Sequence, residues 1–277
     1  KDYFLPSLNL KYNLNDKNSL RLGASKTYTL PQAKEISPYR YVGVNFNSQG
    51  NPNLKPSDNY NLDLKWDFNP TPTELISLTA FYKLIKNPIS RIEVASAGGY
   101  LSYENIADKA TVAGVEIEIR KNLFVRPVSN AAHGMNKLSL GLNGSYIYTN
   151  AKMPLATVTT GSQLEGAAPW IVNFDLSHNF TKGERSFVNT LVLNYVSDKI
   201  YTIGTQGYQD VMEQGVLILD FVSQAKLNKH LSLNLKARNL LNPSYKLSRK
   251  ANENGEKVIL NDYKKGINIS LGVSCTF

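Results

Sequence analysis

The sequence predicts an all-β fold, an antiparallel transmembrane β-barrel of the outer-membrane type. Three observations predict it: apolar and polar residues alternate through most of the chain, short and long connections follow one another, and aromatic residues recur at both ends of the apolar faces. Successive side chains of a strand point to opposite faces, so this alternation gives each strand one apolar and one polar face. Barrels that cross the outer membrane join such strands with short turns at one end and long loops at the other.

The composition narrows the class of protein. The 277 residues are 42% hydrophobic and carry a formal charge of +9. No run of about 18 apolar residues occurs, so a transmembrane helix is not expected. The single cysteine, Cys275, has no partner for an internal disulfide. The basic residues are spread through strands and loops rather than gathered with aromatics in a compact motif, so we expect no nucleic acid among the partners.

Patterns typical of catalysis or metal binding are missing from the sequence. No G-x-S-x-G, Walker or zinc pattern occurs. Glu116 and Glu118 share a strand face and resemble a carboxylate pair for acid–base catalysis, but we favour a role in a polar barrel lumen. The three histidines lie far apart, without metal-ligand spacing; they are His133, His178 and His230. We therefore expect no enzyme, no metal and no cofactor.

Eleven strands are expected, each about as long as a strand that crosses the outer membrane. Periodicity of the helical kind is scarce throughout the chain. In chain order the expected strands cover residues 3–13, 18–30, 58–69, 74–86, 111–121, 136–150, 167–180, 186–199, 215–227, 229–241 and 265–277.

The strand at 18–30 contains the clearest exception to the pattern. Leu20, Leu22 and Ala24 share one face, and Lys26 follows them in the same phase. A basic side chain that faces lipid at mid-bilayer costs roughly 2–4 kcal/mol. Because Lys26 lies near the expected outer end, either its stem snorkels to the interface or a β-bulge resets the phase.

The strands that follow divide into two faces more cleanly. At 58–69, Tyr60, Leu62, Leu64, Trp66 and Phe68 oppose Asn61, Asp63, Lys65 and Asp67. At 111–121, Val115, Ile117 and Ile119 oppose Glu116, Glu118 and Arg120. At 136–150, Leu138, Leu140, Leu142, Tyr146 and Tyr148 oppose Ser139, Asn143 and Ser145. At 167–180, Trp170, Val172, Phe174, Leu176 and Phe180 oppose Asn173, Asp175, Ser177 and Asn179. The strand at 186–199 is weaker because valines make its second face partly apolar, whereas 265–277 alternates regularly and stops on Phe277.

The connections fix the orientation. Short ones lie near 14–17, 70–73, 181–185 and 227–229, and 122–135 falls in a short position; long ones lie near 31–57, 87–110, 151–166, 200–214 and 242–264. If the last strand runs toward the periplasm, every long connection is extracellular. Aromatics of the apolar faces then form two girdles, an outer one of Tyr28, Tyr60, Tyr82, Tyr148, Trp170 and Tyr195 and a periplasmic one of Tyr12, Phe68, Phe180 and Phe277.

Most charged residues of the strands take the polar phase, so we expect them to face the lumen. This set comprises Arg21, Asp63, Lys65, Glu116, Glu118, Arg120, Asp175 and Arg238.

Several local patterns resemble the carboxyl-terminal half of the barrel of TonB-dependent outer-membrane receptors. Each is weak alone, but their order and spacing over nearly the whole chain are specific. They are the segment from Ser19 to Thr27 leading to Leu30-Pro31, Gly50-Asn51-Pro52-Asn53-Leu54-Lys55-Pro56, Ala80-Phe81-Tyr82-Lys83 with Asn87-Pro88-Ile89, Gly114-Val115-Glu116-Ile117-Glu118, Arg238-Asn239-Leu240-Leu241-Asn242-Pro243-Ser244-Tyr245, and the closing Phe277.

The resemblance implies a location and a function. Barrels of such receptors have 22 strands and an amino-terminal plug in the lumen, so residues 1–277 would be the carboxyl-terminal part of the barrel, with about half the strands and no plug. The receptors take up scarce substrates, such as iron chelates, vitamins or glycans, across the outer membrane with energy from the TonB complex. The implied partners are therefore outer-membrane lipid and lipopolysaccharide, the TonB complex through the missing amino-terminal part, and a small-molecule or oligosaccharide substrate.

Substrate would contact the extracellular loops, where aromatic and cationic side chains are the candidates. They are Tyr39, Arg40, Tyr41, Tyr100, Tyr103, Tyr201, Tyr208 and Arg249. The alternative is a surface-adhesion or structural module, a β-barrel or β-sandwich that binds a partner with its loops and transports nothing.

Overall fold

The computed structural model describes residues 3–44, 46–94, 99–128, 134–153, 162–251 and 255–276. The predictions for His133 and Phe277 lie outside these residues.

Eleven antiparallel strands form one continuous sheet, paired in the order in which they follow one another along the chain. They are β1 (Ser7–Asn15), β2 (Asn18–Thr29), β5 (Ser57–Phe68), β6 (Leu75–Lys86), β9 (Lys109–Pro127), β10 (Met135–Ala151), β11 (Trp170–Lys182), β12 (Arg185–Val196), β15 (Val216–Lys226), β16 (Leu231–Arg238) and β19 (Asn268–Cys275). Each of the predicted strands overlaps one of these, so the predicted all-β, antiparallel fold is confirmed.

The largest difference in length is at β9, which continues to Pro127 although the alternation predicts an end near residue 121. The register explains the difference. Asn122 lies opposite Ser139 and Phe124 opposite Leu138, so Leu123 has no partner of its own. This extra residue is a β-bulge that shifts the phase of all later residues by one. A sequence pattern of period two therefore ends there while the pairing continues.

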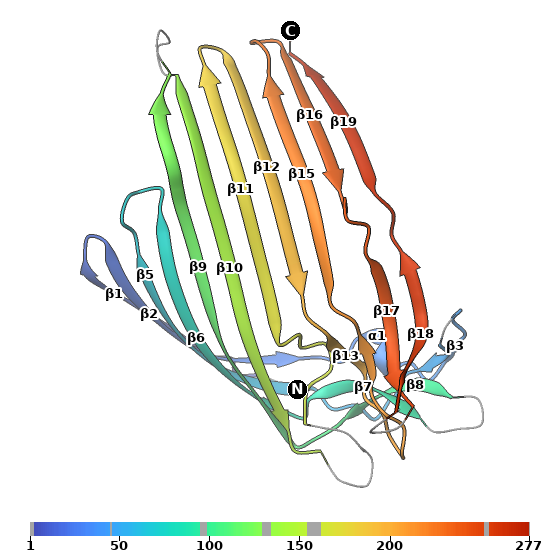
Figure 1. Cartoon of the computed structure of the whole chain (residues 1–277). Coiled ribbons are helices and arrows are strands. Elements are labelled where there is room, and N and C mark those ends of the chain that lie inside the picture. The colour runs from blue at the N-terminus through green and yellow to red at the C-terminus, as the bar shows by residue number, and fades with distance from the viewer. Residues whose placement is uncertain are drawn as a thin grey trace.

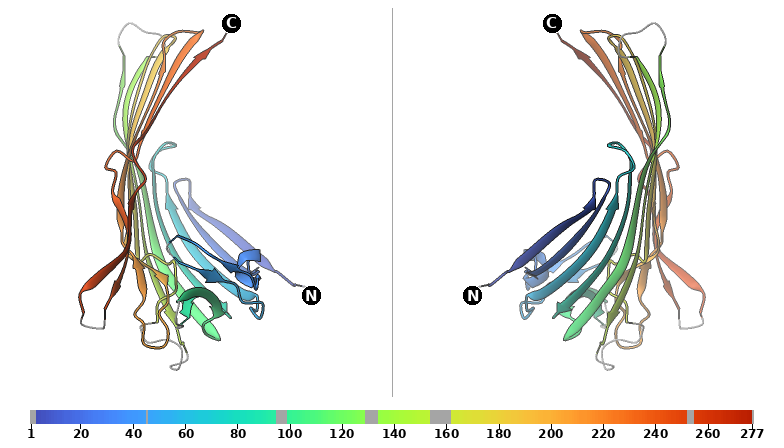
Figure 2. Two further views of the ribbon diagram at one scale, coloured as in Figure 1. Left: turned by 90° about the vertical axis from the view of Figure 1, so that its right-hand side faces the viewer. Right: turned by 90° about the vertical axis from the view of Figure 1, so that its left-hand side faces the viewer.

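The sheet is a curved, open wall (Figure 1). Its open edges are β1 and β19, and the long connections gather at one end of the strands while the short turns lie at the other. Figure 2 shows that β1 and β2 swing out of the plane of the central strands, which gives the wall a convex and a concave side.

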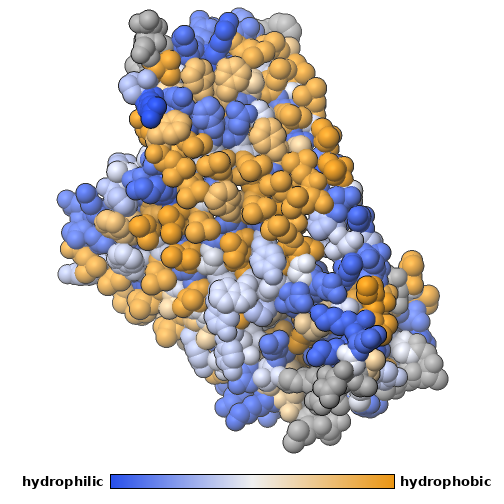
Figure 3. Space-filling model, viewed as in Figure 1, coloured by the Kyte–Doolittle hydropathy of each residue, from blue (hydrophilic) through white to orange (hydrophobic). Residues whose placement is uncertain are grey.

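The convex side carries the apolar faces of the strands. The register aligns them in rows, for example Leu10 opposite Leu22, Leu22 opposite Leu64 and Leu64 opposite Ala80. Figure 3 shows the resulting apolar band across this side. Leu64 is 51% exposed and Leu271 72% exposed, and within the described ranges no helix or second sheet covers this side. An uncovered apolar band of this kind is what a wall in contact with lipid presents.

Lys26 lies on the convex side, in the phase that the alternation predicts. Pairing of β2 with β5 runs without a shift from Asn18 to Thr29, so no bulge resets the phase. Instead, the Nζ atom of Lys26 lies 3.4 Å from the Asp58 carboxylate and 5.6 Å from the centre of the Tyr60 ring. The carboxylate and the ring therefore hold the ammonium group at the loop end of the strand.

The long connections, predicted as loops, contain eight further strands and a short helix, α1 (Ala33–Ile36). One small sheet has the order β3 (Arg40–Tyr41), β4 (Ser48–Gln49), β8 (Tyr100–Asn105), β7 (Ile89–Val94). The other has the order β13 (Lys199–Thr202), β14 (Val211–Glu213), β17 (Ser244–Lys250), β18 (Lys257–Lys264). The long connection at 242–264 thus contains a β-ribbon, β17 paired with β18. In the described part of the chain, no helix is long and apolar enough to cross a membrane.

The main buried core lies among these connections rather than in the wall. Ile92 and Ile200 are 4% exposed and Ile203 is 1% exposed, and they pack with Leu164 and with Ala110 at the loop end of β9. A wall one strand thick leaves both of its faces open, so it has no interior. The loop end has several layers of chain and can bury apolar side chains. We call this assembly of the two small sheets and their connections the loop cap.

The division of faces predicts the effect of adding a charge to β6. Leu78→Arg places a guanidinium on the convex side and is expected to lower the free energy of unfolding by about 2–4 kcal/mol. Thr79→Arg places it on the concave side, where Thr79 lies opposite Lys65 and Glu116, and is expected to cost about 1 kcal/mol or less. Urea unfolding in lipid vesicles measures both, and equal losses would contradict the assignment of the faces.

Candidate functional site

The loop cap is joined across its two sheets by β7 and β13. The Glu93 amide donates to the Ile203 carbonyl, and the Ile203 amide donates to the Arg91 carbonyl, both at 3.0 Å. The backbones of two separate connections, one with β7 and β8 and one with β13, are therefore fixed at one place.

Arg91 lies at this junction and binds Glu165 twice. Its amide donates to Oε2 at 2.7 Å, and its Nη2 donates to Oε1 at 2.8 Å. The guanidinium lies 4.2 Å from the centre of the Tyr201 ring. Burial lowers the pKa of Arg91, but the Glu165 carboxylate, with Tyr201 and Tyr103, raises it to a net value above the ordinary one. Arg91 thus remains a cation whose charge is neutralised inside the cap.

A second ion pair joins the two small sheets. Arg249 of β17 binds the Glu93 carboxylate of β7, and both side chains are less than one-fifth exposed. The guanidinium of Arg249 also lies 5.3 Å from the centre of the Tyr208 ring. Because its charge is already compensated, Arg249 holds the cap together rather than offering a free cation.

The eight predicted ligand contacts all belong to the loop end, but the structure separates them into two groups. Three of them are parts of the cap: Tyr103 and Tyr201 lie beside Arg91, and Arg249 is paired with Glu93. Tyr39, Arg40 and Tyr41 are exposed at β3, and Arg40 lies 5.6 Å from the Tyr100 ring centre. Tyr208 is also exposed. The accessible candidates are therefore Tyr39, Arg40, Tyr41, Tyr100 and Tyr208.

Sequence reasoning missed the groups that build this junction. Arg91, Glu93 and Glu165 lie in segments without a clear alternation, and their pairing depends on contacts between connections far apart in the chain. The local signal was the presence of two charged residues, Arg91 and Glu93, within the short apolar stretch Ile89–Val94.

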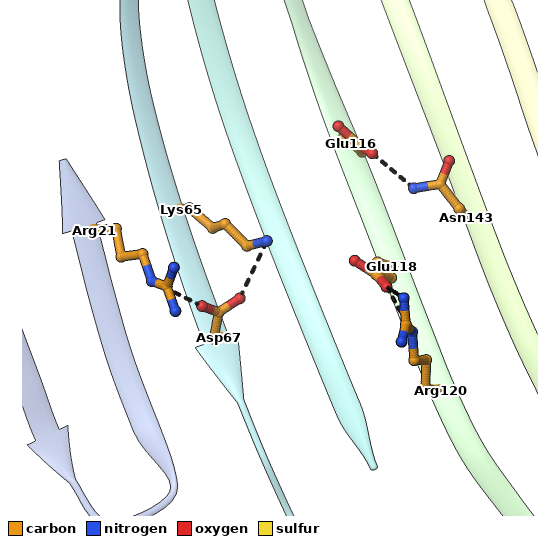
Figure 4. A network of polar contacts seen from close by, with 7 residues as sticks. All are labelled: Arg21, Lys65, Asp67, Glu116, Glu118, Arg120 and Asn143. Atoms are coloured by element: carbon orange, nitrogen blue, oxygen red, sulfur yellow. Dashed lines mark hydrogen bonds and ion pairs between the residues drawn. The ribbon is translucent and has the colours of Figure 1, made fainter. Parts of the chain in front are cut away.

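The concave side of the wall carries the predicted lumen-facing residues, all eight in the phase opposite to the apolar rows. Figure 4 shows two clusters that five of them form with Asp67 and Asn143. In the first, Arg21 Nε and Lys65 Nζ lie 3.3 Å and 3.6 Å from the carboxylate of Asp67, which is almost fully buried. Asp63 lies opposite Gly23 beside this cluster. Asp67 was not among the predicted site residues.

The second cluster begins on β9 and β10 (Figure 4) and continues to β12. Arg120 donates to Glu118 at 2.8 Å, and Asn143 Nδ2 donates to Glu116 at 2.7 Å. A ladder of amides continues the row, because Asn173 donates to Asn143 at 3.2 Å and Asn194 donates to Asn173 at 2.6 Å. The polar side chains thus satisfy one another along the wall.

A hollow of about 420 Å³ lies over these strands, lined by Glu118, Arg120 and Asp175 among others. Gly141 makes room for Asp175, since a Cβ at that position would lie 2.1 Å from the Asp175 carboxylate oxygen. Arg238 is exposed in the same phase, opposite Asn268 near the far edge. Within the described residues, no three His, Cys, Asp or Glu side chains are grouped so that they could hold a metal ion.

Comparison with known proteins gives a family and a fold. The family model described as TonB dependent receptor-like, beta-barrel matches residues 1–240. Two curated relatives from Vibrio cholerae serotype O1 are each named iron-regulated outer membrane virulence protein. One is 25% identical over 228 residues, which are 79% of this chain and 32% of the relative. The chain therefore spans about a third of the length of the curated relatives it matches.

Solved structures of outer-membrane receptors share the fold. The ferric enterobactin receptor of Pseudomonas aeruginosa matches 99% of this chain with 40% of its own, at 18% identity and a TM-score of 0.61. The ferric yersiniabactin uptake receptor of Yersinia pestis matches 99% with 37% of its own, at 16% identity and a TM-score of 0.63. A copper transporter matches 98% with 40% of its own, at 13% identity and a TM-score of 0.65.

The Arg91–Glu165 pair predicts how a mutation loosens the cap. Glu165→Gln keeps the shape of the side chain and removes its charge, so amide hydrogen exchange at Arg91 and Ile203 is expected to accelerate about tenfold. Glu104→Gln is the matched control, because Glu104 lies in β8 of the same small sheet and has no ion pair among the described residues. Unchanged exchange in Glu165→Gln would show that the pair does not hold the junction.

Tyr103 predicts a pH effect at the same place. Burial raises the pKa of its phenol above the ordinary 10.0, and the Arg91 charge offsets only part of this shift. A raised pKa in the folded state means that stability is present below pH 10 and is lost as the pH rises through the folded value. An ultraviolet titration should therefore show a phenolate transition above pH 10.0 that is missing in Tyr103→Phe, and this variant should keep its stability at alkaline pH. If the transition that Tyr103→Phe removes lies at or below pH 10.0, the prediction is contradicted.

Proposed function

The chain belongs to the TonB-dependent receptor β-barrel family, and on this premise we propose that it is part of an outer-membrane receptor for the uptake of a ferric chelate, powered through the TonB complex. The family and the location in the outer membrane follow from the comparisons. Ferric chelate as the substrate, and TonB as the source of energy, are the finer part of the proposal. The named relatives and the receptor structures support it.

The proposal includes the place of this chain in the receptor. We take residues 1–277 as the carboxyl-terminal part of the barrel, with the plug and the other strands in a preceding part. Eleven strands with unpaired edges at β1 and β19 fit this view. Unpaired edges do not occur within hydrocarbon, because every backbone donor and acceptor there needs a partner. The chain also matches only about two-fifths of each receptor structure.

The single observation that carries the substrate class is the chemistry of the accessible face of the loop cap. Arg40 stands beside Tyr100, with Tyr39 and Tyr41 exposed on either side of it along the chain. No carboxylate pairs with Arg40 among the described residues, in contrast to Arg91 and Arg249. A free guanidinium next to aromatic faces favours an anionic ligand with flat or aromatic groups. Many chelators of ferric iron have this chemistry.

The concave wall would then line the route between the cap and the periplasm. Its ion pairs and amide ladder present hydrogen-bond donors and acceptors along the strands. Such a surface suits water, a plug domain or a hydrophilic substrate in transit. We propose the lumen-facing role of these residues on that ground.

Uptake of radioactive iron by cells that carry the full-length receptor tests the proposal. Energised cells should accumulate the ferric chelate, and a protonophore or loss of TonB should abolish uptake while surface binding remains. Arg40→Ala should weaken binding of the chelate about tenfold, since a charge-assisted hydrogen bond contributes about 1.5–3 kcal/mol. Lys257→Ala removes an exposed cation elsewhere on the cap and should bind normally.

Two outcomes would redirect the proposal. Binding without energy-dependent uptake would favour the alternative of an adhesive or structural surface module. Equal affinity of Arg40→Ala and Lys257→Ala would show that the accessible Arg–Tyr group does not contact the ligand.

A further inference from the structure

A row of polar side chains crosses the apolar convex side near the short-turn end of β10, β11, β12 and β15. We call Asn136, His178, Asn189 and Ser223 the polar row. His178 lies in the apolar phase of β11 between Leu176 and Phe180, and the register places it opposite Asn189, which lies opposite Ser223. Figure 3 shows hydrophilic residues interrupting the apolar surface there, with apolar residues on both sides. Polar groups on a lipid-facing wall are costly, so they indicate a role.

The hydrogen bonds within the polar row leave the side-chain N–H donors of its two asparagines unused. His178 Nε2 donates to Asn136 Oδ1 at 2.9 Å, and Ser223 Oγ donates to Asn189 Oδ1 at 2.7 Å. Both amide oxygens are thus used as acceptors. The amide N–H groups of Asn136 and Asn189 have no hydrogen-bond partner in the described part of the chain. An unpaired amide in apolar surroundings costs about 2 kcal/mol or more, so the row lacks an acceptor.

The depth of the row identifies where that acceptor lies. Trp170 and Phe180 end the apolar face of β11, and ten residues span roughly 33 Å of strand, or about 25 Å of membrane at a tilt near 40°. This is the height of the apolar band of an outer-membrane barrel. Phe180 packs with Phe187, ring centres 6.3 Å apart, at the periplasmic end. Asn136 lies level with this pair, opposite Phe180, and the rest of the polar row lies one step inside it. This is the depth where acyl chains join the glycerol esters of a lipid.

Two cations follow on the same face, just beyond the aromatic pair. Lys182 and Arg185 lie directly opposite each other. Both are exposed, and neither has an ion pair among the residues that the structure describes. The carboxylate of Glu184 between them in the chain pairs with Lys229 at 3.0 Å instead. Like charges directly opposite on a sheet are destabilising, and an anion between them would remove the repulsion.

We propose that this surface binds one glycerophospholipid of the periplasmic leaflet. Its phosphate lies between Lys182 and Arg185, whose long stems reach along the wall. Its ester carbonyls accept from the free amide groups of Asn136 and Asn189. Its acyl chains cover the apolar residues beyond the row, such as Leu176. The order of the three chemistries along the strands, cation, donor and apolar surface, is the order of phosphate, ester and chain in the lipid.

The site is separate from substrate uptake. It lies at the end of the wall opposite to the loop cap and on the opposite face from the ion pairs of the concave side. A free phosphate would satisfy only the two cations, and a lipid without phosphate only the amides. A glycerophospholipid satisfies both with one molecule.

Native mass spectrometry of the full-length receptor, released from mild detergent, tests the proposal with phosphatidylglycerol as the probe. The wild-type protein should bind one lipid tightly. The double variant Lys182→Ala/Arg185→Ala should bind it at least about tenfold more weakly, because two charge-assisted contacts are lost. Asn136→Leu/Asn189→Leu should also weaken binding. Lys226→Ala is the matched control, since Lys226 lies at the same rim in the concave phase of β15 and should bind normally.

Diacylglycerol and inorganic phosphate separate the two halves of the site. Neither should displace phosphatidylglycerol at equal concentration. Full displacement by phosphate, with no effect of Asn136→Leu/Asn189→Leu, would show a phosphate site and overturn the proposal. Equal lipid binding by Lys182→Ala/Arg185→Ala and Lys226→Ala would also overturn it. Heat-modifiable gel migration tests whether each variant is folded. If the double variant does not fold, Lys182→Ala alone takes its place in the measurement of lipid binding.

Discussion

The structure depends on one constraint: a strand within a membrane finds partners for its backbone only in the neighbouring strands. Pairing is therefore continuous from β1 to β19, and the register of each pair fixes which side chains stand in one row. Since successive side chains alternate, one continuous ladder of hydrogen bonds also separates apolar from polar residues over the whole wall. The bulge at Leu123 disturbs this ladder only locally, because β9 accommodates the one extra residue and its pairing with β10 continues beyond it.

A wall of this kind has no interior, and this explains the nature of the loop cap. The largest side chains that are almost fully buried, Ile203 and Val211, are in the connections, where several layers of chain meet. Ion pairs between connections, Arg91 with Glu165 and Arg249 with Glu93, then hold the layers in place. The cap is thus a folded unit with its own core rather than a set of independent loops. Its accessible Arg40 and tyrosines are presented from a fixed support, which favours selective binding over loose attraction.

The two ends of the wall differ in chemistry because they meet different surroundings. The loop end pairs arginines with tyrosines and neutralises most of its buried charge internally. The turn end of β11 and β12 sets two cations opposite each other beside an aromatic pair and leaves amide donors unused. Internal neutralisation makes a rigid support, whereas uncompensated charge and unused donors require an external partner. The lipid proposal follows from this contrast between the two ends.

The sequence by itself determined the number and order of the wall strands, their apolar and polar faces, and the position of Lys26 as the exception. Each of these follows from the alternation of neighbouring residues, which is a local property of the chain. The tertiary structure alone decided the strands of the loop cap, the Arg91–Glu165 pair across 74 residues and the His178–Asn136 contact across 42. These depend on register and on the path of the connections, and the free energy that selects them comes from contacts between distant segments. A pattern of period two contains no information about such contacts.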